Sequence, residues 1–397
     1  MSKSVKDILA MIEENGIQMV DFKMVDINGQ YRHVTIPAQN FSEDTMKSGI
    51  GFDASNYGYA VVEKSDMVFI PDPDTAVIDP FCSVPTLSMT GNAMIIDSPE
   101  NRPLAQYPRN IIKAAVEYMK NSGVADEMKI LPEFEFYLFD NVTWNVEGRQ
   151  IAVDVDAQQS YWNSGTEGLG VVVPKQKNYH IAKPFDISYE CRSEMCMHMQ
   201  DAGIEINYHH PEVAASGQFE IEPQLGEVVH MADATMMIKY IIHNTALKYG
   251  KAATFMPKPV WGEAGSGMHV HMILFKDGQP VFSDDEGYAH LSKEAHWFMG
   301  GLLKHIHSLC AITNPSTNSF KRLIPGFEAP VTVGYATSNR SAVIRIPAYA
   351  KAPDKRRFEL RNPDATCNPY FCYAAILMAG LDGIKNKIDP SANGWGP

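Results

Sequence analysis

Residues 130–140, ILPEFEFYLFD, place two carboxylates in a run that is otherwise apolar and aromatic. Side chains alternate between the two faces of a strand, so Glu133 and Glu135 are predicted to share one face. Phe134 and Phe136 then share the other. Two like charges at this spacing repel each other, and burying them is costly unless a positive group compensates. We therefore expect this face either to lie in water or to hold a cation.

Three further segments carry ionisable residues at alternate positions with apolar residues between them. Each is a predicted strand, so its ionisable residues would lie on one face. Four such strands suggest a sheet whose concave face is a binding site. The residues are His209, His210, Glu212 and Glu220 in segment 204–223, His269 and His271 in GSGMHVHMILF, and Arg357, Glu359 and Arg361 in RRFELR.

The types of these side chains favour a hard divalent cation. Glutamates with one or two histidines and no thiolates match Mg²⁺ or Mn²⁺. Zinc would accept the same ligands, but the HExxH pattern is missing and the thiols are scattered. The excess of carboxylates favours more than one metal, and two cations could together hold a phosphate chain.

Five arginines complement the carboxylates. Guanidinium groups suit phosphate and carboxylate oxygens, which they bind in a bidentate way. Together with the glutamates they predict nucleoside triphosphate chemistry on a carboxylate substrate. The five are Arg322, Arg340, Arg345, Arg357 and Arg361.

Each of these features has a plainer explanation when it is taken alone. A single strand glutamate is usually solvated, either histidine of HVH can be a hydrogen-bonded core residue, and arginines often pair with surface acids. The segment GEAGSG (262–267) lacks the GK[ST] of a phosphate loop and is typical of a tight turn. Only the joint occurrence favours a metal–phosphate site, and it does not fix the reaction.

Periodicity and turn residues predict the elements that position these side chains. Residues 1 to about 100 indicate a small, mostly β unit, with a helix at 4–15 capped by Ser4 and a hairpin about Asn28-Gly29. Helices then alternate with strands, and the polar segment 141–182 is predicted to form loops. The predicted strands are 59–64, 67–81, 92–99, 130–140, 204–214 and 266–275, and the later helices are 111–123, 185–203, 231–250, 287–312 and 368–385.

Composition narrows the class of protein. The chain has 397 residues, 45% hydrophobic and 20% charged, as expected of a globular protein with two domains or one large one. A net charge of −13 excludes unspecific binding to nucleic acid or to anionic membranes. The start lacks the apolar stretch of a signal peptide, and six scattered cysteines fit reduced, buried thiols. We expect a cytoplasmic protein with no membrane or nucleic-acid partner.

Seven ordered blocks, from about residue 18 to residue 390, resemble glutamine synthetase of class I, the bacterial type. Such a series over nearly the whole chain is a specific resemblance. The blocks are GFDASNYGYAVVEKSDMVFIPDPDTAVIDPF, PEFEFYLFD, HHPEVAASGQFEIE, ATFMPKPVWGEAGSGMHVHM, NPSTNSFKRLIPGFEAP, NRSAVIRIP and GLDGIKNKI.

The resemblance implies an α+β fold in which a small β-grasp domain, residues 1–102, precedes a large catalytic α/β domain, residues 103–397, with a curved antiparallel sheet. It implies ATP-dependent joining of ammonium to L-glutamate through a γ-glutamyl phosphate, with two or more Mg²⁺ or Mn²⁺ ions per site. It also implies a homo-oligomer, usually a dodecamer of two hexameric rings, in which each active site lies between two subunits.

The resemblance also assigns roles to particular residues of this sequence. The implied ligands of one metal are Glu135, Glu212 and Glu220, and those of a second metal, which bridges the ATP phosphates, are Glu133, His269 and Glu359. The implied ATP contacts are His271, Arg345 and Arg357. The implied substrate contacts are Gly265 and Arg322, with Arg340 and Arg361 neutralising the transferred phosphate. The remaining assignments are Glu328 as the flap residue, Asp53 as the acid lent to a neighbouring subunit's ammonium pocket, and Tyr179 beside that pocket.

The sequence departs from the family pattern in three places, and two of these departures leave the amine substrate open. FDGSS reads FDASN here, so Asn56 replaces a serine, and NGSGMH reads AGSGMH, so Ala264 replaces an asparagine. The family also normally continues past ANGWGP, so we expect a truncated C-terminal end. The first two departures motivate an alternative, a γ-glutamyl-amine ligase that uses another amine. A second alternative is a catalytically dead relative that serves as a binding protein, and retention of the site residues argues against it.

Overall fold

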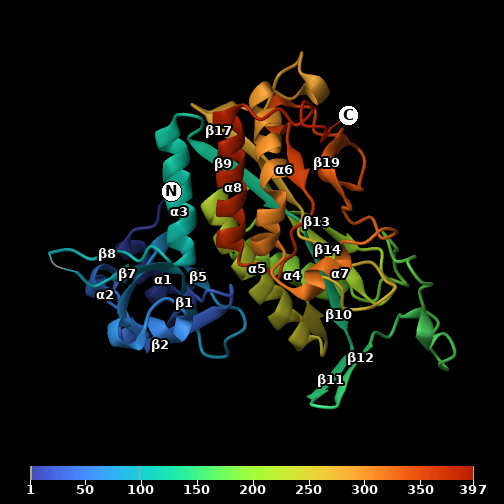
Figure 1. Cartoon of the computed structure of the whole chain (residues 1–397). Helices are drawn as coiled ribbons and strands as arrows, with labels where there is room; N and C mark the ends of the chain where they lie inside the picture. Colours follow the sequence, from blue (N-terminus) through green and yellow to red (C-terminus); the bar gives the residue numbers. More distant parts are fainter. Residues whose placement is uncertain (1, 98, 397) are drawn as a thin grey trace.

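The computed structural model describes residues 2–97 and 99–396. Its N-terminal part holds two four-stranded sheets, with strand orders β2-β1-β6-β5 and β3-β4-β7-β8, and lies to one side of a larger body (Figure 1). Strands β1 and β6 are parallel, and the other pairs are antiparallel. The elements are α1 Val5–Glu14, β1 Met19–Val25, β2 Tyr31–Pro37, α2 Glu43–Ser48, β3 Ile50–Asp53, β4 Asp66–Pro71, β5 Val77–Ile78, β6 Thr86–Met89, β7 Gly91–Ile95 and β8 Arg102–Pro103.

Local sequence accounts for much of this part. Ser4 caps α1 in a reciprocal capping box with Asp7, as a serine at this position predicts. The hairpin is confirmed, but its strands end at Val25 and Tyr31, so the connection is longer than the two residues that Asn28-Gly29 suggests. The strand predicted at 59–64 is wrong. Residues 62–64 form a 3₁₀ turn, because no strand pairs with this apolar stretch.

The larger body contains a seven-stranded and a four-stranded sheet. The first has the order β15-β9-β17-β21-β20-β19 with β18 beside β17, and the second the order β13-β14-β10-β16. The resemblance implies an antiparallel sheet, and the strand pairs are indeed antiparallel except for β19 and β20 of the seven-stranded sheet, which run parallel. The strands are β9 Glu127–Pro132, β10 Phe134–Phe139, β11 Asn141–Glu147, β12 Gln150–Asp156, β13 Ile206–Pro211, β14 Gln218–Pro223, β15 Gly226–Glu227, β16 Ala252–Thr254, β17 Val270–Lys276, β18 Gln279–Pro280, β19 Thr332–Thr337, β20 Ala342–Ile346 and β21 Phe358–Leu360.

The helices of the larger body pack against these two sheets. Their bounds are α3 Pro108–Ser122, α4 Tyr189–Asp201, α5 Val228–Lys248, α6 Lys293–Thr313, α7 Thr317–Arg322 and α8 Pro369–Asn386. Helices α6 and α8 lie side by side (Figure 1). A Cβ on Gly301 of α6 would stand 2.1 Å from the carbonyl oxygen of Ala379, and one on Gly383 of α8 only 2.0 Å from that of Trp297. The two backbones therefore touch directly.

The strand predicted at 130–140 is two strands, divided at Glu133. Pro132 ends β9 because proline has no N–H for the ladder. The chain then passes from the seven-stranded sheet into the four-stranded one, where β10 begins. Glu133 thus stands between the two sheets, and its N–H donates to the carbonyl of His269 at 2.9 Å.

Segment 141–156 corrects the prediction of loops over 141–182. It forms a hairpin, β11 and β12, joined at Gly148-Arg149. Val142, Trp144 and Val146 alternate with polar residues and pair with the apolar residues Val155, Val153 and Ile151. In Figure 1 the hairpin projects from the body, and most of this apolar face is exposed, with Trp144 72% and Ile151 77% accessible.

Besides a small cluster of Tyr137, Phe139, Ala157, Ala214 and Ala264, two large hydrophobic clusters form the core of the described residues. One is built from residues between Ile8 and Tyr107, and the other contains mostly residues from Ile112 to Leu381. The boundary at residue 102 stays a prediction. All six cysteines are free thiols; Cys191, Cys367 and Cys372 are buried as expected, whereas Cys196 and Cys310 are partly exposed and Cys82 is exposed. Among the described residues, no helix is long and apolar enough to cross a membrane.

Arg109 at the start of α3 links the two parts. It is 4% exposed, and its guanidinium contacts Asp233 of α5 at 2.9 Å and Asp72 of the N-terminal part at 2.7 Å. Asn92 of β7 accepts a further hydrogen bond at 3.0 Å. These partly buried ion pairs therefore fix how α3 and α5 sit against the N-terminal sheets.

Replacing Arg109 by methionine is expected to lower the free energy of unfolding by about 3–5 kcal/mol, because Asp233, whose side chain is only 13% exposed, would lose its cation. Denaturant unfolding followed by circular dichroism measures this. Arg102→Met is the control: Arg102 and Asp97 form an exposed pair at 3.0 Å, whose loss costs about 0–1 kcal/mol. Equal effects of the two substitutions would contradict the prediction.

Candidate active site

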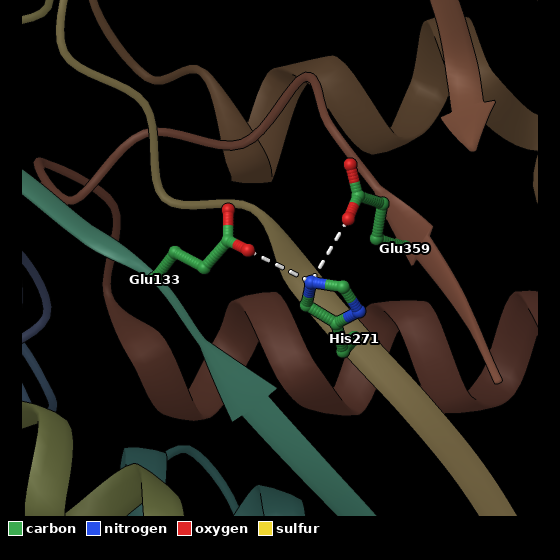
Figure 2. Close-up of side chains that lie close together, drawn as sticks. All are labelled: Glu133, His271 and Glu359. Carbon is green, nitrogen blue, oxygen red and sulfur yellow. Dashed lines mark hydrogen bonds and ion pairs between the residues drawn. The ribbon is translucent and has the colours of Figure 1, made fainter. Parts of the chain in front are cut away.

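Glu133, His271 and Glu359 form the centre of the candidate site (Figure 2). The Nε2 atom of His271 lies 2.9 Å from Glu133 Oε1 and 2.9 Å from Glu359 Oε2. The other oxygen of Glu133 lies 2.6 Å from Nδ1 of His269. His271 belongs to β17 and Glu359 to β21, His269 directly precedes β17, and Glu133 lies at the β9–β10 junction. The ionisable faces of separate strands therefore meet, as their alternation predicts.

Glu359 is fully buried and anchors two arginines. Arg345 of β20 donates to both of its oxygens, at 2.7 and 2.8 Å. Arg361 donates to it at 2.6 Å, and Arg357 donates from Nε to Nδ1 of His271 at 3.2 Å. Nε of Arg361 is itself buried without a hydrogen-bond partner among the described residues. An anion beside Arg361 would satisfy it.

The pKa values at this centre reflect its charges. Burial alone would raise the pKa of Glu133, but hydrogen bonds from His269 and His271 outweigh burial and lower it. Burial opposes the charge on His271, yet Glu359 and Glu133 raise its pKa to about 9. The pKa of Glu359 is held well below its usual range despite burial, chiefly by His271 and then by Arg345. The centre therefore holds two ionised carboxylates, with the imidazole of His271 between them.

A second group of carboxylates lies beside the first. Nδ1 of His210 is 3.7 Å from Glu212 and Nε2 is 3.6 Å from Glu220. Burial raises the pKa of Glu212, and Glu135 and Glu220 raise it further. Burial and then Glu133 and Glu135 do the same for Glu220. Carboxylates that repel each other in a buried place require protons or a cation.

These groups fit divalent cations by the chemistry and spacing of their donors. Three sets of ligand atoms each lie within 4.8 Å of one another: Glu133, His271 and Glu359; His210, Glu212 and Glu220; and Glu133, Glu220 and Glu222. Oxygen donors with an imidazole suit Mg²⁺ or Mn²⁺. The other two predicted ligands lie next to these sets. Glu135 accepts from the N–H of Gly267 at 2.8 Å, and His269 lies between Glu133 and Glu135.

The site contains residues to which sequence reasoning gave no role. Glu222 is 4% exposed, and it accepts hydrogen bonds from Asn207 at 2.8 Å and from the hydroxyl of Tyr208. Tyr208 also lines the pocket, where its ring stacks on that of His210, one of the ionisable residues of the predicted site face. A signal was present, because Glu222 follows Glu220 at the alternate position of β14 and so shares its face.

A pocket of about 250 Å³ gathers most of the predicted residues. Arg322 is 3% exposed, and it donates to the carbonyls of Arg361 and Asn362 at 3.0 Å each. Arg340 lies at 3.9 Å from Glu328. The predicted residues that line the pocket are Glu133, Glu135, Tyr179, Glu212, Glu220, Gly265, His269, Arg322, Glu328, Arg340, Arg345 and Arg361.

Asp53 is the predicted residue that is not brought into this cluster. It ends β3 in the N-terminal part, is exposed, and is absent from the described residues lining the pocket. Its carboxylate accepts from the hydroxyl of Ser55 at 2.6 Å and from Asn56 Nδ2 at 2.7 Å. Hydrogen bonds from Ser55 lower its pKa. The substituted residue Asn56 therefore directly orients Asp53.

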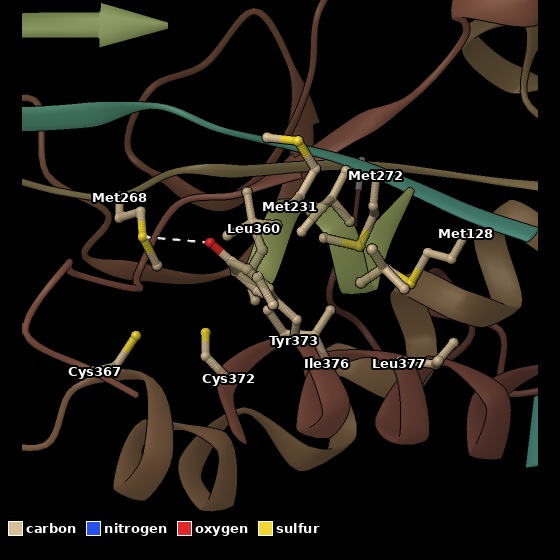
Figure 3. Close-up of a cluster of buried hydrophobic side chains, with 14 of the residues drawn as sticks. Met128, Met231, Met268, Met272, Leu360, Cys367, Cys372, Tyr373, Ile376 and Leu377 are labelled. Atoms are coloured by element: carbon tan, nitrogen blue, oxygen red, sulfur yellow. Dashed lines mark hydrogen bonds between the residues drawn. The ribbon is translucent and has the colours of Figure 1, made fainter. Parts of the chain in front are cut away.

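The strands that carry the site turn their other face into a packed core (Figure 3). Met272 and Leu360 follow His271 and Glu359, and Met268 precedes His269, so alternation points all three inward. All are fully buried, and the hydroxyl of Tyr373 on α8 donates to the sulfur of Met268 at 3.7 Å. Dense packing of this kind holds the backbone of the site strands in place.

Comparison with known proteins identifies the class. The model of the glutamine synthetase catalytic domain matches residues 105–394, and that of the glutamine synthetase β-grasp domain matches residues 16–95. The chain therefore belongs to the glutamine synthetase family, and its α+β architecture is that of the family.

Individual relatives differ in name. A 3-hydroxylaminophenol mutase from Cupriavidus pinatubonensis is 45% identical, over 98% of this chain and 83% of the relative. Glutamine synthetase from Vibrio cholerae is 43% identical over the same shares of the two chains. The solved glutamine synthetase of Plasmodium falciparum superposes with a TM-score of 0.88 at 29% identity, covering 98% of this chain and 77% of that one. A structure named GmaS without ligand has a TM-score of 0.79 at 28% identity, covering 98% and 82%.

Proposed function

We propose that this protein is a glutamate–ammonia ligase, which uses ATP to condense L-glutamate with ammonia and forms L-glutamine through γ-glutamyl phosphate. The observation that carries the proposal is a pocket in which two carboxylate clusters face Arg322, Arg340, Arg345 and Arg361. Acidic clusters beside arginines suit a metal-bound nucleoside triphosphate and a carboxylate substrate. The sequence and its net charge favour a cytoplasmic enzyme with no nucleic-acid partner.

Two or more divalent cations, Mg²⁺ or Mn²⁺, fit the clusters. We assign Glu135, Glu212 and Glu220 to one ion and Glu133, His269 and Glu359 to the other, with His210 and His271 beside them. When bound, such ions neutralise phosphate charge and polarise the phosphoryl group. His271, Arg345 and Arg357 are assigned to ATP, because they form the basic edge of the same cluster.

The chain's own residues supply positioning and charge. A carboxylate resists direct attack by ammonia because oxide is a poor leaving group, and phosphorylation converts it into a good one. Arg322 and the backbone at Gly265 are assigned to glutamate, while Arg340 and Arg361 neutralise the transferred phosphate. Phosphoryl transfer needs placement and electrostatic stabilisation more than covalent help. The partnerless Nε of Arg361 is consistent with an anion there.

Two carboxylates are assigned to the amine and to the exclusion of water. Ammonia is mostly ammonium at neutral pH, so Asp53 binds the cation and takes its proton, with Tyr179 beside it. Glu328 belongs to a loop that closes over the acyl phosphate and keeps water out. Glu328 lines the pocket, whereas Asp53 must come from a second subunit to reach one.

We therefore infer a homo-oligomer, a dodecamer of two hexameric rings, with active sites between subunits. The β11–β12 hairpin supports assembly, because an isolated two-stranded ribbon is marginally stable alone. Its apolar face, containing Val142, Trp144, Val146, Ile151 and Val153, is exposed. Apolar patches of this kind mark interaction surfaces.

Replacing Trp144 by aspartate is expected to weaken assembly. Truncating a central aromatic anchor costs about 2 kcal/mol at an interface, which raises the concentration at half-assembly about 30-fold. Native mass spectrometry over a dilution series measures this. Leu247→Asp on α5 is the control, because Leu247 is also well exposed, at 69%, but lies outside the hairpin. An unchanged mass distribution in Trp144→Asp would remove the hairpin from the interface.

A γ-glutamyl-amine ligase is the second candidate function, and Asn56 and Ala264 favour it. Ala264 is buried in the pocket wall, and Asn56 holds Asp53. The relative named 3-hydroxylaminophenol mutase also indicates that similar chains differ in activity. Glutamate-dependent ATP turnover, measured with ammonium and with a panel of organic amines, decides between the two. Faster turnover with an organic amine would overturn the ammonia assignment.

A non-catalytic binding protein is the remaining alternative. The same assays test it, together with γ-glutamyl transfer to hydroxylamine. Transfer to hydroxylamine would exclude this alternative. Tight binding of Mn²⁺ and ATP without turnover of any substrate would support it.

A further inference from the structure

We propose that Lys258 is a positioning residue that holds the loop over the pocket, by binding the ring of Phe327 next to Glu328. The loop is residues 324–330, IPGFEAP, and is called the Glu328 loop below. The inference rests on the proposed function, in which Glu328 closes the site.

The contacts of Lys258 join three segments of the site. Its Nζ lies 3.6 Å from the centre of the Phe327 ring and donates to the carbonyl of Glu263 in segment 262–267. Its main-chain N–H donates to Asn318 Oδ1 at 2.7 Å, and Asn318 Nδ2 donates back to its carbonyl at 3.1 Å. Asn318 lies in α7, which also carries Arg322. Lys258 therefore connects the Glu328 loop to the segments assigned to glutamate.

The environment makes the aromatic contact important for the charge. Lys258 is 4% exposed, and the carbonyl of Glu263 is its ammonium's hydrogen-bond partner among the described residues. Burial lowers the pKa of Lys258 to about 8, against the attraction of Glu263, while Arg322 lowers it further. A desolvated ammonium gains more from an aromatic face than an exposed one does. The ring thus stabilises the charged form, and the charged form holds the ring.

Glu328, the residue that follows Phe327 in the loop, has contacts of its own. Glu328 has a φ of +57°, a left-handed conformation that is strained for a residue with a side chain. Nη2 of Arg361 donates to its carbonyl at 3.1 Å, and its carboxylate lies 3.9 Å from Arg340. Such a conformation persists only where neighbouring contacts determine it. Phe327 and Lys258 provide one of these contacts.

Hydrogen exchange on the intact protein tests the anchor without turnover. Lys258→Met keeps the length of the side chain and removes the charge, so amides of residues 326–329 are expected to exchange about tenfold faster. Lys258→Arg is expected to keep the wild-type rate. Lys129→Met is the matched control, because Lys129 lies 4.9 Å from the centre of the Phe275 ring, away from the pocket. An unchanged rate in Lys258→Met would overturn the proposal.

The charge dependence gives a second readout. Above about pH 8 Lys258 loses its proton, so wild-type protection of residues 326–329, corrected for intrinsic exchange, is expected to fall between pH 7 and pH 9. The variant Lys258→Arg stays charged and is expected to keep its protection. Protection that falls equally in both would overturn the proposal. If Lys258→Met does not fold, Phe327→Leu removes the ring from the opposite side and is expected to show the same increase of about tenfold.

Activity adds a separate arm. Two rates are measured for each protein: ATP hydrolysis with glutamate but no amine, and amide formation with the amine added. The ratio of the first rate to the second is expected to be about tenfold higher in Lys258→Met than in the wild type, because water enters under a loose loop. An unchanged ratio would overturn the positioning role. If the wild type shows no glutamate-dependent turnover at all, the proposed function fails, but the exchange measurements still decide the anchor.

Discussion

Replacing Glu359 by glutamine is expected to lower kcat by about 10²–10³-fold, the range for removing one preorganised electrostatic group. Glu359 is fully buried and contacts His271, Arg345 and Arg361 at 2.9, 2.7 and 2.6 Å. Glutamine keeps the shape but removes the negative charge and one acceptor. The proposed metal ligand set then loses a carboxylate, and Arg345, Arg361 and His271 lose the negative charge of their common partner.

The affinity of Glu359→Gln for Mn²⁺ should also fall, by at least the roughly 10–100-fold seen for outer-shell partners of metals. Calorimetric titration of the protein with Mn²⁺, and turnover as a function of metal concentration, measure the two effects separately. Glu227→Gln is the control, because Glu227 is a partly buried carboxylate that caps α5 outside the site. Unchanged Mn²⁺ affinity in Glu359→Gln would show that Glu359 binds no metal.

Replacing Asp53 by asparagine is expected to lower amide formation by about 10²–10⁴-fold, the usual contribution of a general base. Asparagine retains acceptor and size, so the hydrogen bond from the hydroxyl of Ser55 can persist. ATP binding should stay unchanged, since Asp53 is assigned to the amine and not to the nucleotide. Comparing rates of glutamine formation with ATP affinity separates these two properties.

Mixed subunits test where Asp53 acts. Chains with Asp53→Asn and chains with Arg361→Lys are each expected to be nearly inactive alone. If sites form between subunits, dissociating and reassembling the two together regenerates some sites with both native residues, and activity should recover to about a quarter of wild type when mixing is random. Full activity of Asp53→Asn alone, or no recovery after confirmed mixing, would contradict the assignment.

The sequence predicted which side chains meet at the site better than it predicted where the strands begin and end. Alternation placed Glu133 with Glu135 and His269 with His271; Glu133, Glu135 and His269 line the pocket, and the fully buried His271 contacts Glu133. Pro132 also carried the information that the strand divides at Glu133, but one residue without an N–H does not tell which sheets lie on either side. That depends on pairings between distant segments.

The errors have physical causes as well. Residues 59–64 have strand-forming side chains, but no neighbouring strand accepts them, and β propensity reflects context more than the backbone itself. The β11–β12 hairpin was missed because its polar residues suggested loops, although Val142, Trp144 and Val146 alternate regularly. Apart from Val155, which packs against a small buried cluster, its apolar residues are exposed, so the pattern that marks a buried strand here marks a surface. The pocket proposed for Asp53 belongs to a second subunit, whose position the fold of one chain does not give.

The direct contact of α6 and α8 has a mechanical consequence. Where backbone meets backbone at Gly301 and Gly383, no deformable side chains lie between the helices to absorb a displacement. At its first turn α8 meets the N-terminal part, where Asn368 donates to the carbonyls of Asp26 and Ile27 at 3.3 Å. Helix α6 leads into α7 and Arg322. A displacement of the N-terminal part would therefore be transmitted through α8 and α6, which move as one rigid unit, to Arg322 in the pocket.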